Sequence, residues 1–118
     1  MTTRDEGIHG EDAAVQTLKK EGYRILERNH RNKLGEIDIV AEEKKCLVFV
    51  EVKKRNTSSF GEAVYAVDKR KKRHLVKAAM MYMKINRCFD RQARFDVIAI
   101  DGEQIKLIRN AFLVDEIR

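Results

Sequence analysis

Two apolar runs joined by a short polar turn constrain the fold of this chain more than any other feature. The runs span residues 36–42 and 46–53, and charged residues separate them. Each run has the length and the β-branched content of a buried strand. Closing a hairpin at residues 43–46 gives a register in which Asp38 lies opposite Glu51.

Hydrophobic periodicity predicts the order helix, three strands, helix, then one or two strands. The expected helices are residues 10–22 and 64–86, and the other expected strands are residues 23–30, 94–100 and 104–109. Short turns between the first three strands predict an antiparallel meander. The sequence of strand, long helix and buried strand predicts a right-handed parallel crossover. We therefore expect an α/β fold, with one mixed sheet flanked by helices.

A chain of 118 residues suits one domain, residues 1–118, and we expect residues 1–8 to be flexible. A loop is expected at residues 56–62. The apolar faces of the two helices are expected to form the core. Their members are Ala14, Val15, Leu18 and, less strongly, Glu11 in the first helix, and Val67, Leu75, Ala78, Ala79, Tyr82 and Met83 in the second.

The charge balance favours a polyanionic partner. Lys and Arg number 25 against 19 Asp and Glu, which gives a net charge of +6. Nucleic acid is the first candidate and an anionic membrane surface the second. Neither a secretory signal nor a membrane span is expected, because no long apolar run occurs. Cys46 and Cys88 read as reduced thiols of a cytoplasmic protein, and their spacing argues against zinc.

The charged residues of the two apolar strands are the main functional signal. Two carboxylates opposed across strands repel each other, and burial makes them costlier. A divalent cation such as Mg²⁺ between Asp38 and Glu51 would reverse that repulsion. Lys53 follows on the same strand face and would orient water or neutralise phosphate charge. The alternative is that all three residues merely reach solvent at strand ends.

The Glu-x-Lys pattern by itself is weak, because the chain contains two further copies. Glu42 with Lys44 and Glu43 with Lys45 repeat the spacing, and we expect both pairs in a solvated turn. Only the copy formed by Glu51 and Lys53 ends an apolar strand.

Combined motifs carry a family resemblance over nearly the whole chain. Asp38 followed by Glu51-Val52-Lys53, on the second and third expected strands, resembles the PD-(D/E)xK nuclease superfamily. More closely, the stretches "GEIDIVA", "LVFVEVKKR", "FGEAV" and "RFDVIAI" resemble the YraN family of uncharacterised bacterial proteins, which is similar to archaeal Holliday-junction resolvases. The resemblance implies a restriction-endonuclease-like α-β-β-β-α-β core with a mixed central sheet.

The resemblance also implies roles for individual residues. Glu11, Asp38 and Glu51 would be ligands of Mg²⁺ or Mn²⁺, Asp38, Glu51 and Lys53 would be catalytic, and Glu36 would be an extra carboxylate. Ile37 stands where the superfamily's name has a proline. The implied function is a metal-dependent endonuclease acting on branched DNA, and symmetric cleavage would need a homodimer.

Two basic runs supply the expected nucleic-acid surface. Their members are Lys53, Lys54 and Arg55 in the first run, and Lys69, Arg70, Lys71, Lys72 and Arg73 in the second. Lys71 falls on the core-facing line of its helix, so we expect it either at the rim of the active site or snorkelling to solvent. Phe60 and Tyr65 are candidates for base stacking, although packing against the second helix is favoured.

Two other functions stay open from the sequence. The first is a non-catalytic module that retains a nuclease fold and binds nucleic acid. The second is a nuclease or binding protein directed to RNA, although DNA is favoured. The Asp38, Glu51 and Lys53 set argues against the pure binder, because carboxylates repel phosphate.

Overall fold

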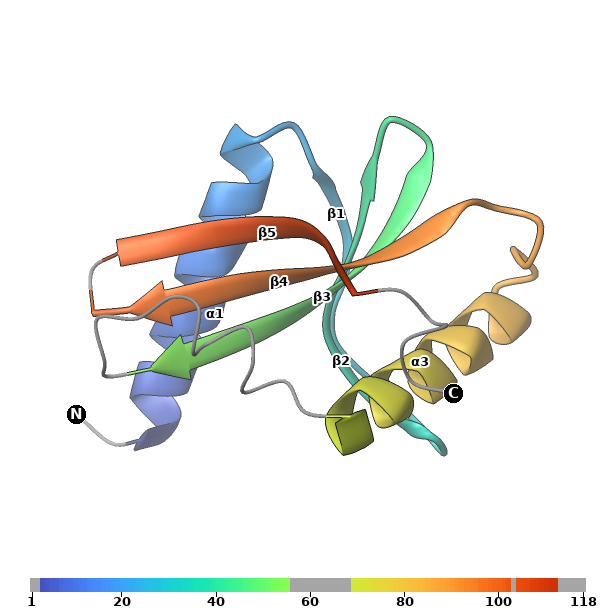
Figure 1. Ribbon diagram of the computed structural model, residues 1–118, viewed down its shortest axis with the longest axis horizontal. Helices are drawn as coiled ribbons and strands as arrows, with labels where there is room; N and C mark the ends of the chain where they lie inside the picture. The colour runs from blue at the N-terminus through green and yellow to red at the C-terminus, as the bar shows by residue number, and fades with distance from the viewer. Residues whose placement is uncertain (1–2, 56–68, 103, 113–118) are drawn as a thin grey trace.

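Five strands form one mixed sheet, and a helix packs against each of its faces (Figure 1). The computed structural model describes residues 3–55, 69–102 and 104–112. The elements, in chain order, are α1 (Thr3–Lys20), β1 (Arg24–Asn32), β2 (Gly35–Glu43), β3 (Cys46–Arg55), α3 (Lys69–Ile85), β4 (Ala93–Asp101) and β5 (Gln104–Phe112).

The sheet has the strand order β1-β2-β3-β4-β5. The first three strands pair antiparallel, β4 pairs parallel to β3, and β5 pairs antiparallel to β4. The expected α/β class, the meander and the parallel crossover are therefore confirmed, and the arrangement is compatible with a restriction-endonuclease-like core. None of the helices described is long and apolar enough to cross a membrane.

The hairpin between β2 and β3 has the expected register. Its pairs run from Glu43 with Cys46 to Ile39 with Val50. Lys44 and Lys45 form the two-residue turn, with φ angles of 49° and 71°. Positive φ at both turn positions is the geometry that matches the right-handed twist of the flanking strands.

Element boundaries differ from expectation mainly at the helices. The first helix begins at Thr3 and ends at Lys20, so the expected range 10–22 was wrong at its start. Gly7 and Gly10 both lie inside the helix, which tolerates them because each glycine costs only about 1 kcal/mol there. The expected loop at 56–62 and the expected helical residues 64–68 lie outside the described residues.

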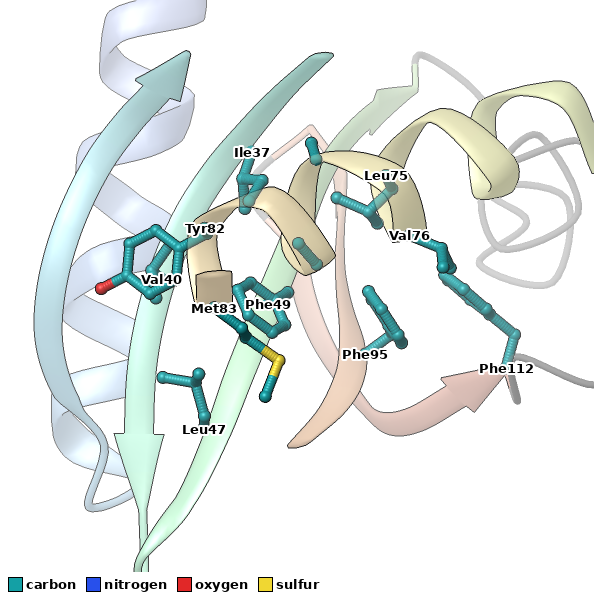
Figure 2. Packing of buried hydrophobic residues seen from close by; sticks show 12 residues of the cluster. Ile37, Val40, Leu47, Phe49, Leu75, Val76, Tyr82, Met83, Phe95 and Phe112 are labelled. Carbon is teal, nitrogen blue, oxygen red and sulfur yellow. The ribbon is translucent and has the colours of Figure 1, made fainter. Parts of the chain in front are cut away.

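An aromatic cluster fills the core between the sheet and α3 (Figure 2). The Phe49 ring lies 5.7 Å from the rings of Tyr82 and Phe95. The expected apolar line of this helix is confirmed, except for Val67, which lies outside the described part of the chain. The members that are buried are Leu75, Ala78, Ala79, Tyr82 and Met83.

The opposite face of the sheet packs on α1. Ala14, Val15 and Leu18 are buried against strand residues that include Val48 and Val50, as expected. Phe49 belongs to the cluster under α3, so consecutive residues of β3 face different helices. Glu51 and Lys53 therefore lie on the α3 side.

Candidate metal and phosphate site

The pairing between β2 and β3 opens at the point where the acidic residues begin. The ladder ends at Ile39 and Val50. If it continued, the next hydrogen-bonded pair would join Val52 to Ile37. Instead the Val52 backbone N–H donates to Asp38 Oδ2 at 2.8 Å, and Ile37 packs in the cluster under α3. The Asp38 carboxylate thus takes the place of a ladder acceptor between the two strands.

Glu51 completes a carboxylate pair with Asp38. The Glu51 residue is only 5% exposed, Asp38 is half-buried, and the two carboxyl groups lie close enough for Glu51 to raise the pKa of Asp38. The ammonium group of Lys71 contacts Glu51 Oε1 from α3. Among the described residues, Lys71 is the cation whose ion pair with this site is seen, and its own side chain is 46% exposed.

This arrangement raises the pKa of Asp38 to about 7. Burial is the largest cause, and the negative charge of Glu51 adds to it. The Val52 N–H and the Lys71 charge act in the opposite direction but do not cancel the rise. A proton shared by two carboxyl groups is the expected state of such a pair when no other cation neutralises it.

The structure brings the two basic runs together at this pair. Lys53 lies two residues beyond Glu51 on β3 and is half-buried, opposite Ala99 of β4. The contact between Lys71 and Glu51 places the beginning of the described α3 beside the end of β3. Lys71 thus contacts the pair from α3, while Lys53 follows Glu51 on the same face of β3.

The other basic residues predicted to bind nucleic acid differ in their solvent exposure. Lys72 is half-buried, and its Nζ lies 5.2 Å from the centre of the Phe112 ring. The side chain of Arg55 lies outside the described part, as do Phe60 and Tyr65. The remaining predicted residues are exposed, and they are Lys54, Lys69, Arg70 and Arg73.

The two further predicted acids do not join the pair. No three His, Cys, Asp or Glu residues in the described segments lie close enough together to hold an ion, so Glu11 does not complete a triad with Asp38 and Glu51. Glu11 is on α1, which packs on the opposite face of the sheet. Glu36 is exposed, and its Oε1 lies 3.2 Å from Arg31 Nε.

The pair alone has the chemistry for a hard divalent cation. Mg²⁺ prefers oxygen ligands and is commonly held by one or two carboxylates, with water and phosphate oxygens completing its shell. Asp38 and Glu51 supply those carboxylates, and a second positive charge would replace the shared proton. The residues present therefore fit Mg²⁺ or Mn²⁺ without a third protein carboxylate.

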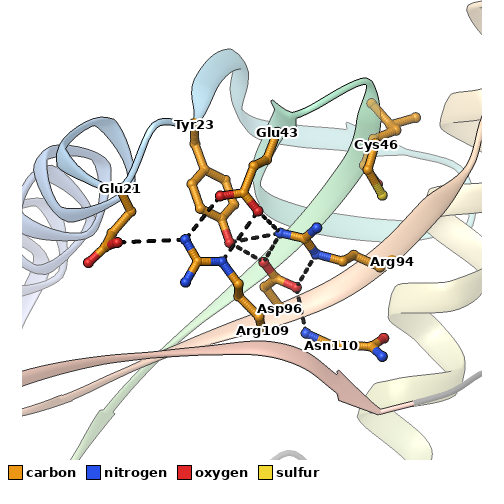
Figure 3. A network of polar contacts seen from close by, with 9 residues as sticks. Glu21, Tyr23, Glu43, Cys46, Arg94, Asp96, Arg109 and Asn110 are labelled. Carbon is orange, nitrogen blue, oxygen red and sulfur yellow. Dashed lines mark hydrogen bonds and ion pairs between the residues drawn. The ribbon is translucent and has the colours of Figure 1, made fainter.

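A second buried acid forms a polar network that the sequence analysis missed (Figure 3). Asp96 of β4 is fully buried. Its carboxylate accepts hydrogen bonds from Tyr23 Oη at 2.6 Å, Arg94 Nε at 3.0 Å and the Asn110 backbone N–H at 2.8 Å. Burial and the Asp96 carboxylate raise the pKa of Tyr23, so its hydroxyl stays a donor.

Glu43 extends this network and corrects one expectation. Its side chain is only 11% exposed, and its carboxylate bonds Arg94 Nη2 at 2.5 Å and Arg109 Nη2 at 3.0 Å. The expected solvated turn was therefore wrong for Glu43. Arginines from β4 and β5 reach it, and their hydrogen bonds lower its pKa. Arg94, two residues before Asp96 on the same strand face, was the local sequence signal that could have indicated a paired acid.

Comparisons with known proteins agree on one family. The model of the uncharacterised protein family UPF0102 matches residues 10–100. The UPF0102 protein of Fusobacterium nucleatum is 44% identical over 117 residues, which cover 99% of this chain and 98% of that protein. Its counterpart in Desulfosudis oleivorans is 47% identical over 108 residues, which cover 90% of this chain and 88% of that protein. The expected YraN-like resemblance is confirmed, and the chain belongs to the UPF0102 family.

Proposed function

We propose that this protein is a Mg²⁺- or Mn²⁺-dependent endonuclease that hydrolyses phosphodiesters in branched DNA. The observation that carries the proposal is the pair formed by buried Glu51 and half-buried Asp38, with the Lys71 ammonium at Glu51. Two neighbouring carboxylates that are withdrawn from water cost the fold stability, because their charges repel each other and lose hydration. Such a pair is useful when a divalent cation binds there.

Each residue of the site has a defined task in this proposal. Asp38 and Glu51 hold the metal ion, which supplies Lewis-acid charge and makes water a better nucleophile at neutral pH. Lys53 lies on the same strand face as Glu51 and orients the attacking water or stabilises charge that develops on the phosphate. The exposed Lys54, Lys69, Arg70 and Arg73, together with Lys72 and Arg55, bind the DNA backbone.

The preference for branched DNA rests on the resemblance of the family to archaeal Holliday-junction resolvases. Cleavage of both strands at a four-way junction requires two sites, so the proposal includes a homodimer on such substrates. A retained nuclease fold that only binds nucleic acid, and a nuclease directed to RNA, are the alternatives that the experiment separates.

The test is a cleavage assay on a panel of labelled substrates with Mg²⁺ or Mn²⁺. The panel contains a four-way junction, a flap, duplex DNA, single-stranded DNA and RNA. We expect junction cleavage by the native chain and a loss of at least about 100-fold in Glu51→Gln and Lys53→Ala. Asp12→Asn, which removes an exposed carboxylate of α1, is the matched control and should cleave normally.

The outcome decides between the three functions. Cleavage confined to RNA would show that the protein is a nuclease directed to RNA rather than to branched DNA. Binding without cleavage under either metal ion would contradict the enzyme and favour the binding module.

A further inference from the structure

The ion pair between Lys71 and Glu51 brings a half-exposed ammonium group to a place where a metal ion would bind. The Lys71 side chain is 46% exposed, whereas that of Glu51 is 6% exposed. A lysine reaching from the surface holds its ammonium group by a long flexible stem. The contact can therefore break by movement of the lysine alone, without displacing the strand that carries Glu51.

The position of Lys71 on α3 also allows its ammonium group to leave Glu51 while the backbone stays in place. Leu75, one turn further along α3, is buried in the core under the sheet, and Lys71 lies on the same side of the helix. The rigid packing of that helix fixes the base of the lysine beside β3. Lys72 instead lies over the Phe112 ring, so the two neighbours have different partners.

A divalent cation and the Lys71 ammonium would compete for the carboxylate of Glu51. Asp38 and Glu51 carry up to two negative charges, and Lys71 supplies one positive charge at Glu51. A divalent cation held by the same oxygens would lie within a few ångströms of the ammonium and repel it. Metal ion and ammonium therefore exclude each other from Glu51.

We infer that Lys71 is a built-in substitute for the metal ion, which holds Glu51 in the metal-free protein and is displaced when a divalent cation binds. Lys71 is then a positioning residue that keeps the two carboxylates in place before loading and weakens the affinity for metal ions. This inference rests on the proposed metal site and adds a mechanism that regulates its loading.

The test measures Mn²⁺ affinity by calorimetry at pH 8 and thermal stability in the presence of a chelator. Lys71→Met should bind Mn²⁺ about tenfold more tightly than the native chain, because the competing charge is gone. The same variant should melt at a lower temperature without metal. Lys77→Met removes an exposed lysine from the same helix and should change neither quantity. A role in stability alone would lower the melting temperature without tightening Mn²⁺ binding.

Two further variants keep the result interpretable. If Lys71→Met does not fold, Lys71→Gln provides the same test. It preserves a hydrogen-bond donor for Glu51 and should also bind Mn²⁺ more tightly than the native chain. Glu51→Gln should abolish Mn²⁺ binding. Unchanged or weaker Mn²⁺ binding in both Lys71 variants, with native binding intact, would overturn this inference alone. Equal binding by Glu51→Gln and the native chain would overturn the proposed site and this inference with it.

Discussion

The two buried acidic sites of this sheet differ in how their charge is neutralised. Asp96 accepts hydrogen bonds from Arg94 of its own strand and from Tyr23 and Asn110 of two other segments, and two arginines balance the charges of Asp96 and Glu43. Asp38 and Glu51 lie side by side on the other face, with the ammonium of Lys71 at Glu51. In the first arrangement, two arginines face two carboxylates. In the second, the contacts of the described residues bring one ammonium group to two carboxyl groups.

The same substitution at the two sites therefore has opposite expected effects. Asp96→Asn removes the charge on which Arg94 and Tyr23 depend and should destabilise the protein by roughly 3 kcal/mol. Urea unfolding measures this. A loss below about 1 kcal/mol would show that the network contributes little, and the contrast between the sites would fail.

At the other site, Asp38→Asn should stabilise the metal-free protein by roughly 2 kcal/mol at pH 8. The amide oxygen can still accept the Val52 N–H, while one of two repelling charges is gone. Urea unfolding in the presence of a chelator measures the difference. A destabilised variant would mean that the native carboxylate pair is already balanced.

The sequence predicted the second site better than the first, for a physical reason. Strand register is local, so the two-residue turn after Glu43 sufficed to predict the pairing as far as Ile39 and Val50, which brings Asp38 next to Glu51. The opening of the ladder at Asp38 was not predicted, because it depends on Ile37 packing under α3. Periodicity alone could not reveal that.

The Asp96 network depends on contacts between distant segments. Tyr23 follows α1 and Arg109 belongs to β5, and neither position carries a local signal for a buried acid. Glu11 shows the converse limit. The resemblance placed it with Asp38 and Glu51, whereas in this structure the three do not gather within the described segments.

The stability gained by Asp38→Asn should depend on pH, because Asp38 titrates in the folded protein. The folded-state pKa of Asp38, about 7, lies above its unfolded value near 4, so the folded state binds the proton more tightly. The associated stability is present below pH 4 and is lost as the pH rises through 7. The advantage of Asp38→Asn over the native chain should fall to below about 1 kcal/mol at pH 5. An equal advantage at pH 5 and pH 8 would exclude titration of Asp38 as the cause.

The smallest expected loss of unfolding free energy is at Arg109, at the exposed edge of the Asp96 network. Arg109 bonds Glu43, but its side chain is 44% exposed, and solvent screens such pairs. Arg109→Met should cost no more than about 1 kcal/mol, measured by urea unfolding beside Lys106→Met as a control on the same strand. A loss as large as that of Asp96→Asn would mean that Arg109, rather than Asp96, organises the network.

Anomalous diffraction from crystals soaked in Mn²⁺ would show whether Asp38 and Glu51 hold a divalent cation in place of Lys71. We expect one Mn²⁺ peak within roughly 2–2.5 Å of oxygens from both Asp38 and Glu51, with the Lys71 ammonium withdrawn from Glu51. If the pair bound no Mn²⁺ at saturating concentration and kept its contact with Lys71, both the metal site and the displacement of Lys71 would be wrong.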